Sequence, residues 1–294
     1  MKKLAFIGVI AVMMTTSCSS LKIVDQNAAV NAGTAVVQAL TISDSQISQL
    51  CSQYMVETDG QNTILPADNS YTQRLNRIMA KFHNISDMNL NYKVYQSSTV
   101  NAFASGDGSI RVYSGLMDVM SDDELFAVIG HELGHLKNKD VRDAYRTAYL
   151  VVAARYGISA FSQTAGAISQ GFLGDLAQQL AESAYSRKQE YEADEASFQY
   201  CVTNGVDPFA MYKALNVLIS LNGSSSTQGI VAQMFATHPD SAKRATRIKE
   251  MAEAAGYKMT TGGSKPSSGN SNNGNSNSGG KPSGSGGKLS IKKG

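Results

Sequence analysis

The stretch that decides the fold is residues 121–135, which read Ser-Asp-Asp-Glu-Leu-Phe-Ala-Val-Ile-Gly-His-Glu-Leu-Gly-His. Ser121 and Glu124 have the spacing of a capping box, in which each side chain accepts a hydrogen bond from the backbone amide of the other residue. This spacing predicts that a helix begins here. Residues 125–130 are apolar on nearly all sides of that helix, so other elements must bury it. Histidine and glutamate side chains at its end would cost several kcal/mol if they were buried without partners.

The end of this predicted helix has the residue types of a metal site. His131 and His135 are four residues apart, so their imidazoles lie one turn apart on the same helix face. Two imidazoles placed in this way can bind one ion at about 2.1 Å, and the spacing is typical of zinc sites. Glu132 lies beside them, where it can hold and deprotonate a water molecule. The motif therefore predicts one zinc ion per chain, with Glu132 as the general base of a hydrolysis.

A catalytic zinc site needs a third protein ligand and one open position. The strongest candidate is Glu190, which is four residues before Asp194. A second helix could direct Glu190 to the metal and Asp194 to a histidine ligand. The composition of this acidic segment is equally compatible with a solvated helix face. His238 is a competing ligand, whereas His83 is interpreted as an ordinary surface or helix-end histidine.

The rest of the central region predicts a small sheet and many helices. Alternating apolar and polar residues predict short strands over 89–96, 100–104 and 109–113. The Gly- and Asp-containing segment 105–108 predicts a hairpin loop between the last two strands. The predicted fold class is therefore α+β, a mainly helical domain with a small antiparallel sheet. Helical periodicity covers most of the remaining segments, over 25–60, 71–82, 141–161, 172–203 with a break, 208–221 and 239–255.

The N-terminus has the pattern of an export signal. Two lysines precede an apolar run over 4–14, and Thr-Thr-Ser then precedes Cys18. The run is shorter than the roughly 20 residues that span a bilayer, which favours a secretory signal peptide. A cysteine directly after small residues resembles a bacterial lipobox, so we expect Cys18 to be the lipidated first mature residue and to anchor the chain to a membrane. An ordinary signal peptide that is cleaved nearby is the alternative.

The C-terminus is compositionally different from the central region. Of the 27 residues in 262–288, 22 are Gly, Ser or Asn. Such a segment buries too little apolar surface to offset its conformational entropy, which predicts a disordered tail. We therefore expect a signal peptide over 1–17, a linker over 18–39, a zinc-binding domain over 40–257 and a tail over 258–294.

Charge and cysteine content exclude several classes of protein. The chain has 26 Lys and Arg against 24 Asp and Glu, but residues 18–261 contain 19 of these cations and all 24 acids. This negative balance disfavours binding to nucleic acid, which requires a basic surface. Three cysteines are too few for a disulfide scaffold. The sequence does not decide whether Cys51 and Cys201 form a disulfide, which would be compatible with an oxidising compartment.

The motif 131–135, followed about 55 residues later by Glu190-x-x-x-Asp194, resembles the HtpX-type and CaaX-protease-type zinc metallopeptidases, which are gluzincins. The resemblance covers roughly residues 40–255, and the most similar branch consists of soluble lipoproteins. It implies a zincin-like domain that hydrolyses polypeptides. Further matching segments are 91–95, 101–104, 110–117 and His238-Pro239 with Arg244.

The resemblance also implies roles for individual residues. Zinc would be bound by His131, His135 and Glu190, with Glu132 as general base and acid and Asp194 orienting a ligand.

Two further segments would act on the substrate. His238 would approach the metal or stabilise the developing oxyanion. It lies near the C-terminal end of the domain, in a segment that also contains Arg244. A capping role for His238 before Pro239 is the alternative. An extended peptide would pair with a strand at the cleft edge, formed by Asn101, Ala102, Phe103 and Ala104.

Two functions from different classes follow. The leading hypothesis is a lipid-anchored endopeptidase at the periplasmic face of the bacterial outer membrane, which degrades unfolded or misassembled proteins. The alternative is a latent or non-catalytic, chaperone-like factor that contains zinc and serves envelope assembly machinery. In that alternative, His238 would fill the fourth coordination position and exclude the water that hydrolysis needs.

Overall fold

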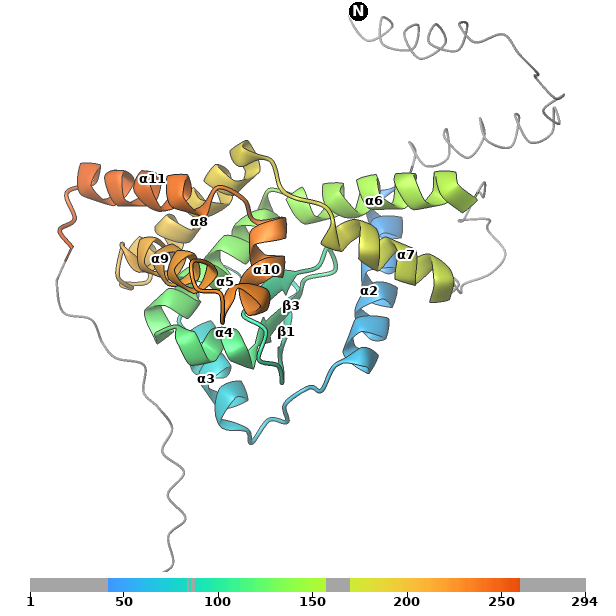
Figure 1. Cartoon of the computed structure of the whole chain (residues 1–294), viewed down its shortest axis with the longest axis horizontal. Coiled ribbons are helices and arrows are strands. Elements are labelled where there is room, and N and C mark those ends of the chain that lie inside the picture. The colour runs from blue at the N-terminus through green and yellow to red at the C-terminus, as the bar shows by residue number, and fades with distance from the viewer. Residues whose placement is uncertain (1–41, 84, 86–87, 157–169, 260–294) are drawn as a thin grey trace, which may run out of the picture.

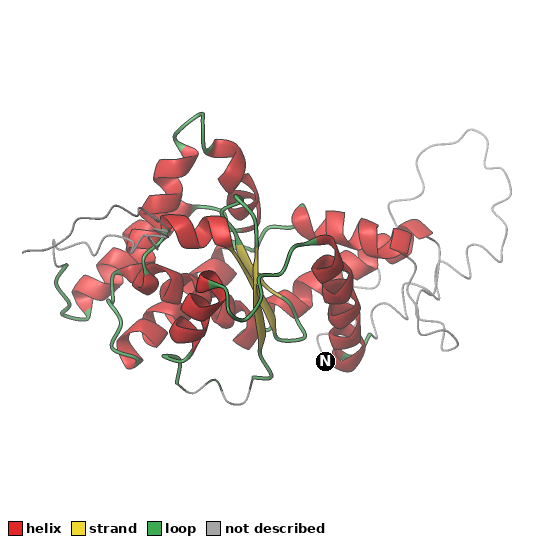
Figure 2. Cartoon of the chain, turned by 90° about the horizontal axis from the view of Figure 1, so that it is seen from below, coloured by secondary structure: helices red, strands yellow, loops and turns green. Residues whose placement is uncertain are grey.

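A computed structural model describes residues 42–83, 85, 88–156 and 170–259. Within these residues, the domain is mainly helical with one small sheet, which confirms the predicted fold class (Figures 1 and 2). The predicted signal peptide, Cys18, the linker 18–39 and nearly all of the tail lie outside the described residues. The helices are α2 (Asp44–Gln61), α3 (Ser70–Met79), α4 (Ser114–Val119), α5 (Asp122–Lys137), α6 (Asp140–Tyr156), α7 (Gln170–Ala181), α8 (Arg187–Thr203), α9 (Ala210–Asn222), α10 (Gln228–Thr237) and α11 (Ser241–Ala254).

The sheet is mixed, so the prediction of an antiparallel sheet is wrong for one strand. Its strands are β1 (Asn91–Tyr95), β2 (Ala102–Ala104) and β3 (Ser109–Tyr113), in the order β1-β3-β2. β2 and β3 form the predicted antiparallel hairpin, but β3 returns between the other two strands and runs parallel to β1. Alternation of apolar residues identifies strands and does not fix their order. The consequence for the site is that β2 lies at an edge of the sheet.

A glycine closes the hairpin between β2 and β3. Gly108 has a φ of +91°, a left-handed conformation that side chains rarely adopt. A Cβ atom at Gly108 would lie 2.2 Å from the carbonyl oxygen of Asn89. The loop can therefore pass this close to the start of β1 only with glycine at this position.

Helix α5 is the centre of the domain. Its capping box forms as predicted, because the Ser121 amide donates to Glu124 Oε2 at 2.7 Å and the Glu124 amide donates to Ser121 Oγ at 3.4 Å. Every residue from Leu125 to His135 is buried. Figure 1 shows the sheet between α5 on one side and α2 on the other. The polar end of α5 therefore lies inside the domain.

Helix α8 packs unusually closely against α5. A Cβ atom at Gly134 would lie 2.9 Å from the Cα atom of Ala193, so the two backbones approach here only because residue 134 is glycine. Ser197 Oγ also donates a hydrogen bond to the Ala127 carbonyl oxygen at 2.6 Å. This packing brings the N-terminal half of α8 next to the histidines of α5.

The predicted helix over 172–203 is two helices, as the expected break allowed. α7 ends at Ala181, and α8 begins after a second capping box, formed by Ser186 and Gln189. Helix α10 was not predicted, although it carries residues that line the site described below. None of the described helices combines the length and apolar character that a membrane span requires.

The cysteines of the domain are not bonded to each other. Cys51 in α2 and Cys201 in α8 are both free and buried, so the alternative of a disulfide between them is wrong. Burial raises the pKa of each thiol to about 12. At neutral pH both cysteines are therefore small, uncharged core residues.

We predict that Gly134→Ala pushes α8 away from α5. The added methyl group must displace backbone atoms of Ala193, and overpacking of this kind costs about 1–3 kcal/mol. Thermal unfolding should therefore show a lower melting temperature, and dialysis against a chelator should remove zinc faster than from the wild type. Gly174→Ala is the matched control, because a Cβ atom there meets nothing within 4 Å. Equal stability and equal zinc retention of the two variants would contradict the role given to Gly134.

Candidate active site

Four buried side chains from three parts of the fold converge on one point. His131 and His135 come from α5, Glu190 from the first turn of α8, and His238 from the C-cap of α10. One potential ligand atom from each lies within 4.8 Å of the others. His135 Nε2 is 3.3 Å from Glu190 Oε1, and His238 Nδ1 is 3.1 Å from the same oxygen. The three residues that the sequence assigned to a metal are therefore brought together, and His238 joins them.

Carboxylates on the far side of the two imidazoles fix how the rings are oriented. His131 Nδ1 lies 2.9 Å from Asp194 Oδ1, and His135 Nδ1 lies 2.9 Å from Asp140 Oδ2. A carboxylate accepts the Nδ1 proton, so the lone pair of each ring is on Nε2. These two Nε2 atoms are only 3.1 Å apart. Two lone pairs at this distance repel each other unless they share a proton or a metal ion.

The charges around the rings also favour a cation. Burial acts to lower the pKa of His135, but hydrogen bonds to Asp140 and Glu190 raise it to about 9. The carboxylates thus stabilise positive charge between α5 and α8. Two imidazole nitrogens and a carboxylate oxygen are ligands that zinc prefers, and the fourth position would be taken by water or by His238. The residues of the site therefore fit a zinc ion.

Arg244 holds the carboxylates of α8 in place. Its guanidinium, which is fully buried, donates from Nε to Asp194 Oδ2 at 2.9 Å and from Nη2 to Asp194 Oδ1 at 2.7 Å. The same group forms an ion pair with Glu190. Burial alone would raise the pKa of Asp194, but Arg244 and His131 lower it to about 2. Asp194 is therefore ionised at neutral pH and can accept the proton of His131.

Glu132 connects the metal cluster to the sheet. Its Oε2 atom accepts a hydrogen bond from the backbone amide of Ala104 in β2 at 3.1 Å. Its Oε1 atom is buried and has no hydrogen-bond partner among the described residues. The nearest ionisable nitrogen is Nε2 of His238, at 3.7 Å. A buried oxygen without a partner is costly, so a water molecule at this position would satisfy it.

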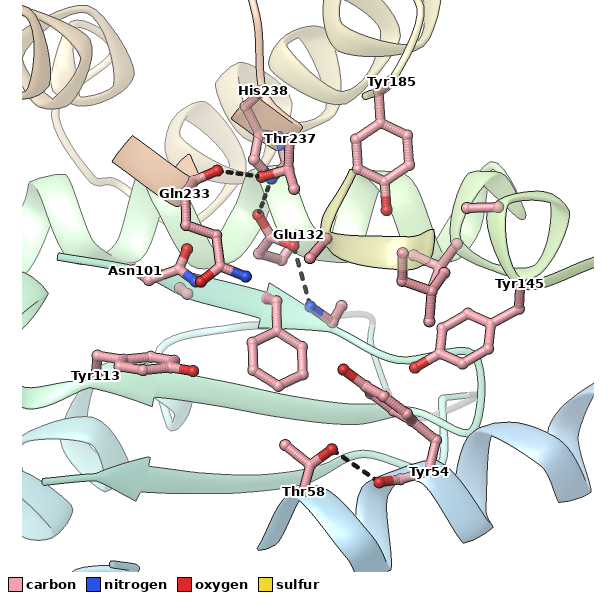
Figure 3. A pocket seen from close by; sticks show the side chains of 17 residues that line it. Tyr54, Thr58, Asn101, Tyr113, Glu132, Tyr145, Tyr185, Gln233, Thr237 and His238 are labelled. Atoms are coloured by element: carbon pink, nitrogen blue, oxygen red, sulfur yellow. Dashed lines mark hydrogen bonds and ion pairs between the residues drawn. The ribbon is translucent and has the colours of Figure 1, made fainter. Parts of the chain in front are cut away.

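A cleft of about 140 Å³ opens in front of Glu132 and His238 (Figure 3). The edge strand β2 forms one wall, α10 covers the cleft from the other side, and aromatic rings from α2 and α6 line its end. All four residues of the predicted substrate strand line it, namely Asn101, Ala102, Phe103 and Ala104. The cleft, the general-base candidate and the metal cluster are therefore continuous.

The structure places three residues whose roles the sequence left open. His238 is the C-cap residue of α10 and not the N-cap of α11, which is Asp240, and its imidazole also lies in the cluster. Glu190 and Asp194 are fully buried, so the acidic segment is not simply a solvated helix face. His83 has an exposed side chain and takes no part in the cluster, as expected.

Two residues of the site were missed by the sequence reasoning. Asp140 follows Lys139, whose φ of 65° reverses the chain after α5 and brings the carboxylate back to His135. Tyr185 stacks on the ring of His135, with centroids 3.9 Å apart and an interplanar angle of 15°. An acid five residues after the second histidine is a usable signal for Asp140. No local pattern distinguishes Tyr185 from other tyrosines.

Comparison with known proteins identifies the family. The model of peptidase family M48 matches residues 66–252. The metalloprotease LoiP of Escherichia coli (strain K12) is 37% identical over 250 residues, which are 85% of this chain and 97% of LoiP. The metalloprotease YcaL of the same organism is 37% identical over 238 residues, covering 81% of this chain and 92% of YcaL.

Two further matches are more distant. A protease HtpX homologue of Thermococcus sibiricus is 30% identical over 202 residues, covering 55% of this chain and 68% of that protein. The crystal structure of S. mikatae Ste24p aligns with a TM-score of 0.42 and 16% identity, over 74% of this chain and 57% of Ste24p. The predicted resemblance to HtpX-type peptidases is confirmed, and with it a metalloprotease that uses zinc and acts on polypeptides. The chain belongs to peptidase family M48, in a branch similar to LoiP.

Proposed function

We propose that this zinc metalloprotease is an endopeptidase of the bacterial cell envelope that hydrolyses unfolded or misassembled proteins. The observation that carries the proposal is the position of Glu132. One of its oxygens accepts a hydrogen bond from the edge strand β2, and the other is buried without a hydrogen-bond partner among the described residues, beside the metal cluster. A base between a peptide-binding strand and a metal site is suited to activating water against a bound peptide.

In the proposed mechanism, zinc is held by His131, His135 and Glu190. When bound, it supplies a Lewis acid that polarises the scissile carbonyl group and lowers the pKa of water to about 7. Glu132 Oε1 takes the proton of the attacking water and then delivers it to the leaving nitrogen. His238, whose Nε2 atom is 3.7 Å from Glu132 Oε1, is placed to donate to the carbonyl oxygen as negative charge develops there.

An extended substrate is favoured by the sheet. Within the described sheet, β2 pairs only with β3, so its other edge is left for a peptide that adds as a further strand. That edge faces the cleft in front of Glu132. Folded proteins rarely present a strand that is free on both edges. We therefore infer that the substrates are unfolded or misassembled chains.

The proposed location rests on the sequence of the N-terminus. Residues 1–17 and Cys18 have the pattern of a lipoprotein signal. The match to LoiP extends over 97% of the length of LoiP. We infer that two or more acyl chains on Cys18 anchor the protein stably to a membrane of the envelope, with its domain in the periplasm.

One observation favours the alternative of a latent protein. His238 Nδ1 lies 3.1 Å from Glu190 Oε1 and 3.3 Å from His131 Nε2, so His238 is as close to the cluster as a fourth ligand would be. A site closed by four protein ligands has no position for water and would be structural or latent. The catalytic and latent interpretations give opposite results when His238 is removed.

The first test is Glu132→Gln. This change keeps the shape of the side chain and removes its basicity, so zinc content should stay at about one ion per chain while cleavage of an unfolded test protein falls by 10²-fold or more. Glu192→Gln, on an exposed turn of the same α8 that carries Glu190, is the control and should cleave normally. Undiminished cleavage by Glu132→Gln would exclude Glu132 as the base.

The second test is His238→Ala. If His238 stabilises charge during the reaction, kcat for an unfolded test protein should fall by roughly 10²-fold. His83→Ala, at an exposed histidine outside the cluster, should have no effect. An increase in cleavage would instead support the latent, chaperone-like protein.

The third test concerns the membrane anchor. Cys18→Ala should prevent lipidation, so the protein should move from the membrane fraction to the soluble fraction of lysed cells and should not incorporate a labelled fatty acid. Cys51→Ala, at a buried cysteine, is the control and should stay in the membrane fraction. An unchanged distribution of Cys18→Ala would contradict the proposed anchor.

A further inference from the structure

Tyr185 lies in the short segment between α7 and α8, outside both sequence motifs of the site. Its ring lies nearly parallel to that of His135, with centroids 3.9 Å apart, and its centroid is 5.4 Å from that of His238. Its backbone amide donates a hydrogen bond to the carbonyl oxygen of Thr237 at 3.2 Å. Tyr185 is thus fixed to α5 through its ring and to the end of α10 through its backbone.

The hydroxyl group of Tyr185 differs from those of Tyr145 and Tyr95. In Figure 3 it points into the cleft that Glu132 lines, and no described residue forms a hydrogen bond with it. By contrast, the Tyr145 hydroxyl lies 3.1 Å from Ser105 Oγ, and the Tyr95 hydroxyl donates to Asp59 at 2.5 Å. A fixed hydroxyl that faces the cleft without a partner is available to a bound molecule.

The side chains around the cluster offer few donors for a substrate. Glu132 and Glu190 are acceptors, and the guanidinium of Arg244 is bound to the carboxylates of α8. His238 and Tyr185 can donate from the wall of the cleft, and Asn101, Gln233 and Thr237 also line it with groups that can donate. Peptide hydrolysis places negative charge on the carbonyl oxygen, and a fixed donor for that charge is among the strongest contributions a site can make.

We propose that Tyr185 is a catalytic residue whose hydroxyl donates a hydrogen bond to the scissile carbonyl oxygen as negative charge develops on it. The inference rests on the proposed peptidase mechanism and adds a second donor beside His238. Tyr185 keeps its proton throughout, so no bond to it forms or breaks. Its stack on His135 fixes the ring, and the hydroxyl therefore needs no reorganisation during the reaction.

A merely structural role predicts a different outcome. If Tyr185 only supports the ring of His135, then phenylalanine should replace it without loss, because Phe keeps the stacked ring. Tyr185→Phe removes only the hydroxyl. Tyr71→Phe in α3 is the matched control, since the Tyr71 hydroxyl donates to Asp118 and this residue does not line the cleft.

The experiment measures zinc content, kcat and KM for a fluorogenic peptide, and the affinity for a phosphinic peptide, which carries tetrahedral oxygens at the scissile position. For Tyr185→Phe we expect about one zinc ion per chain, kcat reduced by about 10²-fold, and KM nearly unchanged. The phosphinic peptide should bind more weakly by a similar factor. Tyr71→Phe should match the wild type in all four measurements.

Three outcomes would overturn the inference. These are a kcat of Tyr185→Phe within about twofold of the wild type, a loss of zinc that accounts for the lower rate, and a rise in KM alone. If the wild-type protein cleaves nothing, the proposed function fails, and the affinity for the phosphinic peptide still decides the role of Tyr185. Equal affinity of wild type and Tyr185→Phe would then reject it.

Discussion

The contact between α5 and α8 is the constraint on which the site depends. The backbones meet where Gly134 faces Ala193, at a distance that no side chain at position 134 would allow. Only this approach brings Glu190, in the first turn of α8, to 3.3 Å from His135. The histidines are fixed by helix periodicity, but the carboxylate reaches them through packing between helices that are more than fifty residues apart in sequence. A small change in that packing would separate the potential ligands.

Charge is the second determinant of the site. Three buried acids, Glu190, Asp194 and Asp140, surround two histidines, and Arg244 compensates for only part of their charge. Their orientation leaves the Nε2 atoms of both rings facing each other at 3.1 Å, so a cation shared between them would stabilise the interior. A metal ion satisfies this need, which explains why so many ionisable groups are tolerated in the core. The same arrangement leaves Glu132 Oε1, next to the cleft, without a hydrogen-bond partner in the part of the chain that the structure describes.

Local sequence signals predicted much of this structure because they depend on contacts between near neighbours. The capping box at Ser121, the hairpin around Gly108 and the spacing of His131 and His135 are all of this kind. The site residues Glu190 and Asp194 were found by family resemblance, since their spacing alone also fits a solvated helix. The local motifs could therefore be predicted from the sequence itself, and the two acids from the resemblance to a family.

The features that the sequence did not reveal depend on tertiary structure. The parallel pairing of β1 with β3 follows from strand order, which the alternation of side chains does not encode. Asp140 contributes because Lys139 adopts a left-handed conformation, and Tyr185 contributes because the segment after α7 is tied to α10. Tyr185 is fixed by packing, and its hydroxyl has no hydrogen-bond partner within the described residues, so only the structure could add it to the residues of the motif.

The most direct test of the central claim is the amount of zinc bound by the purified protein and by its Glu190→Gln variant, measured by elemental analysis after dialysis. The account predicts about one zinc ion per chain in the wild type and little in the variant, because the carboxylate from α8 completes the set of protein ligands. Full zinc content in Glu190→Gln would contradict it, because the convergence of α8 on the two histidines would then not be what holds the metal.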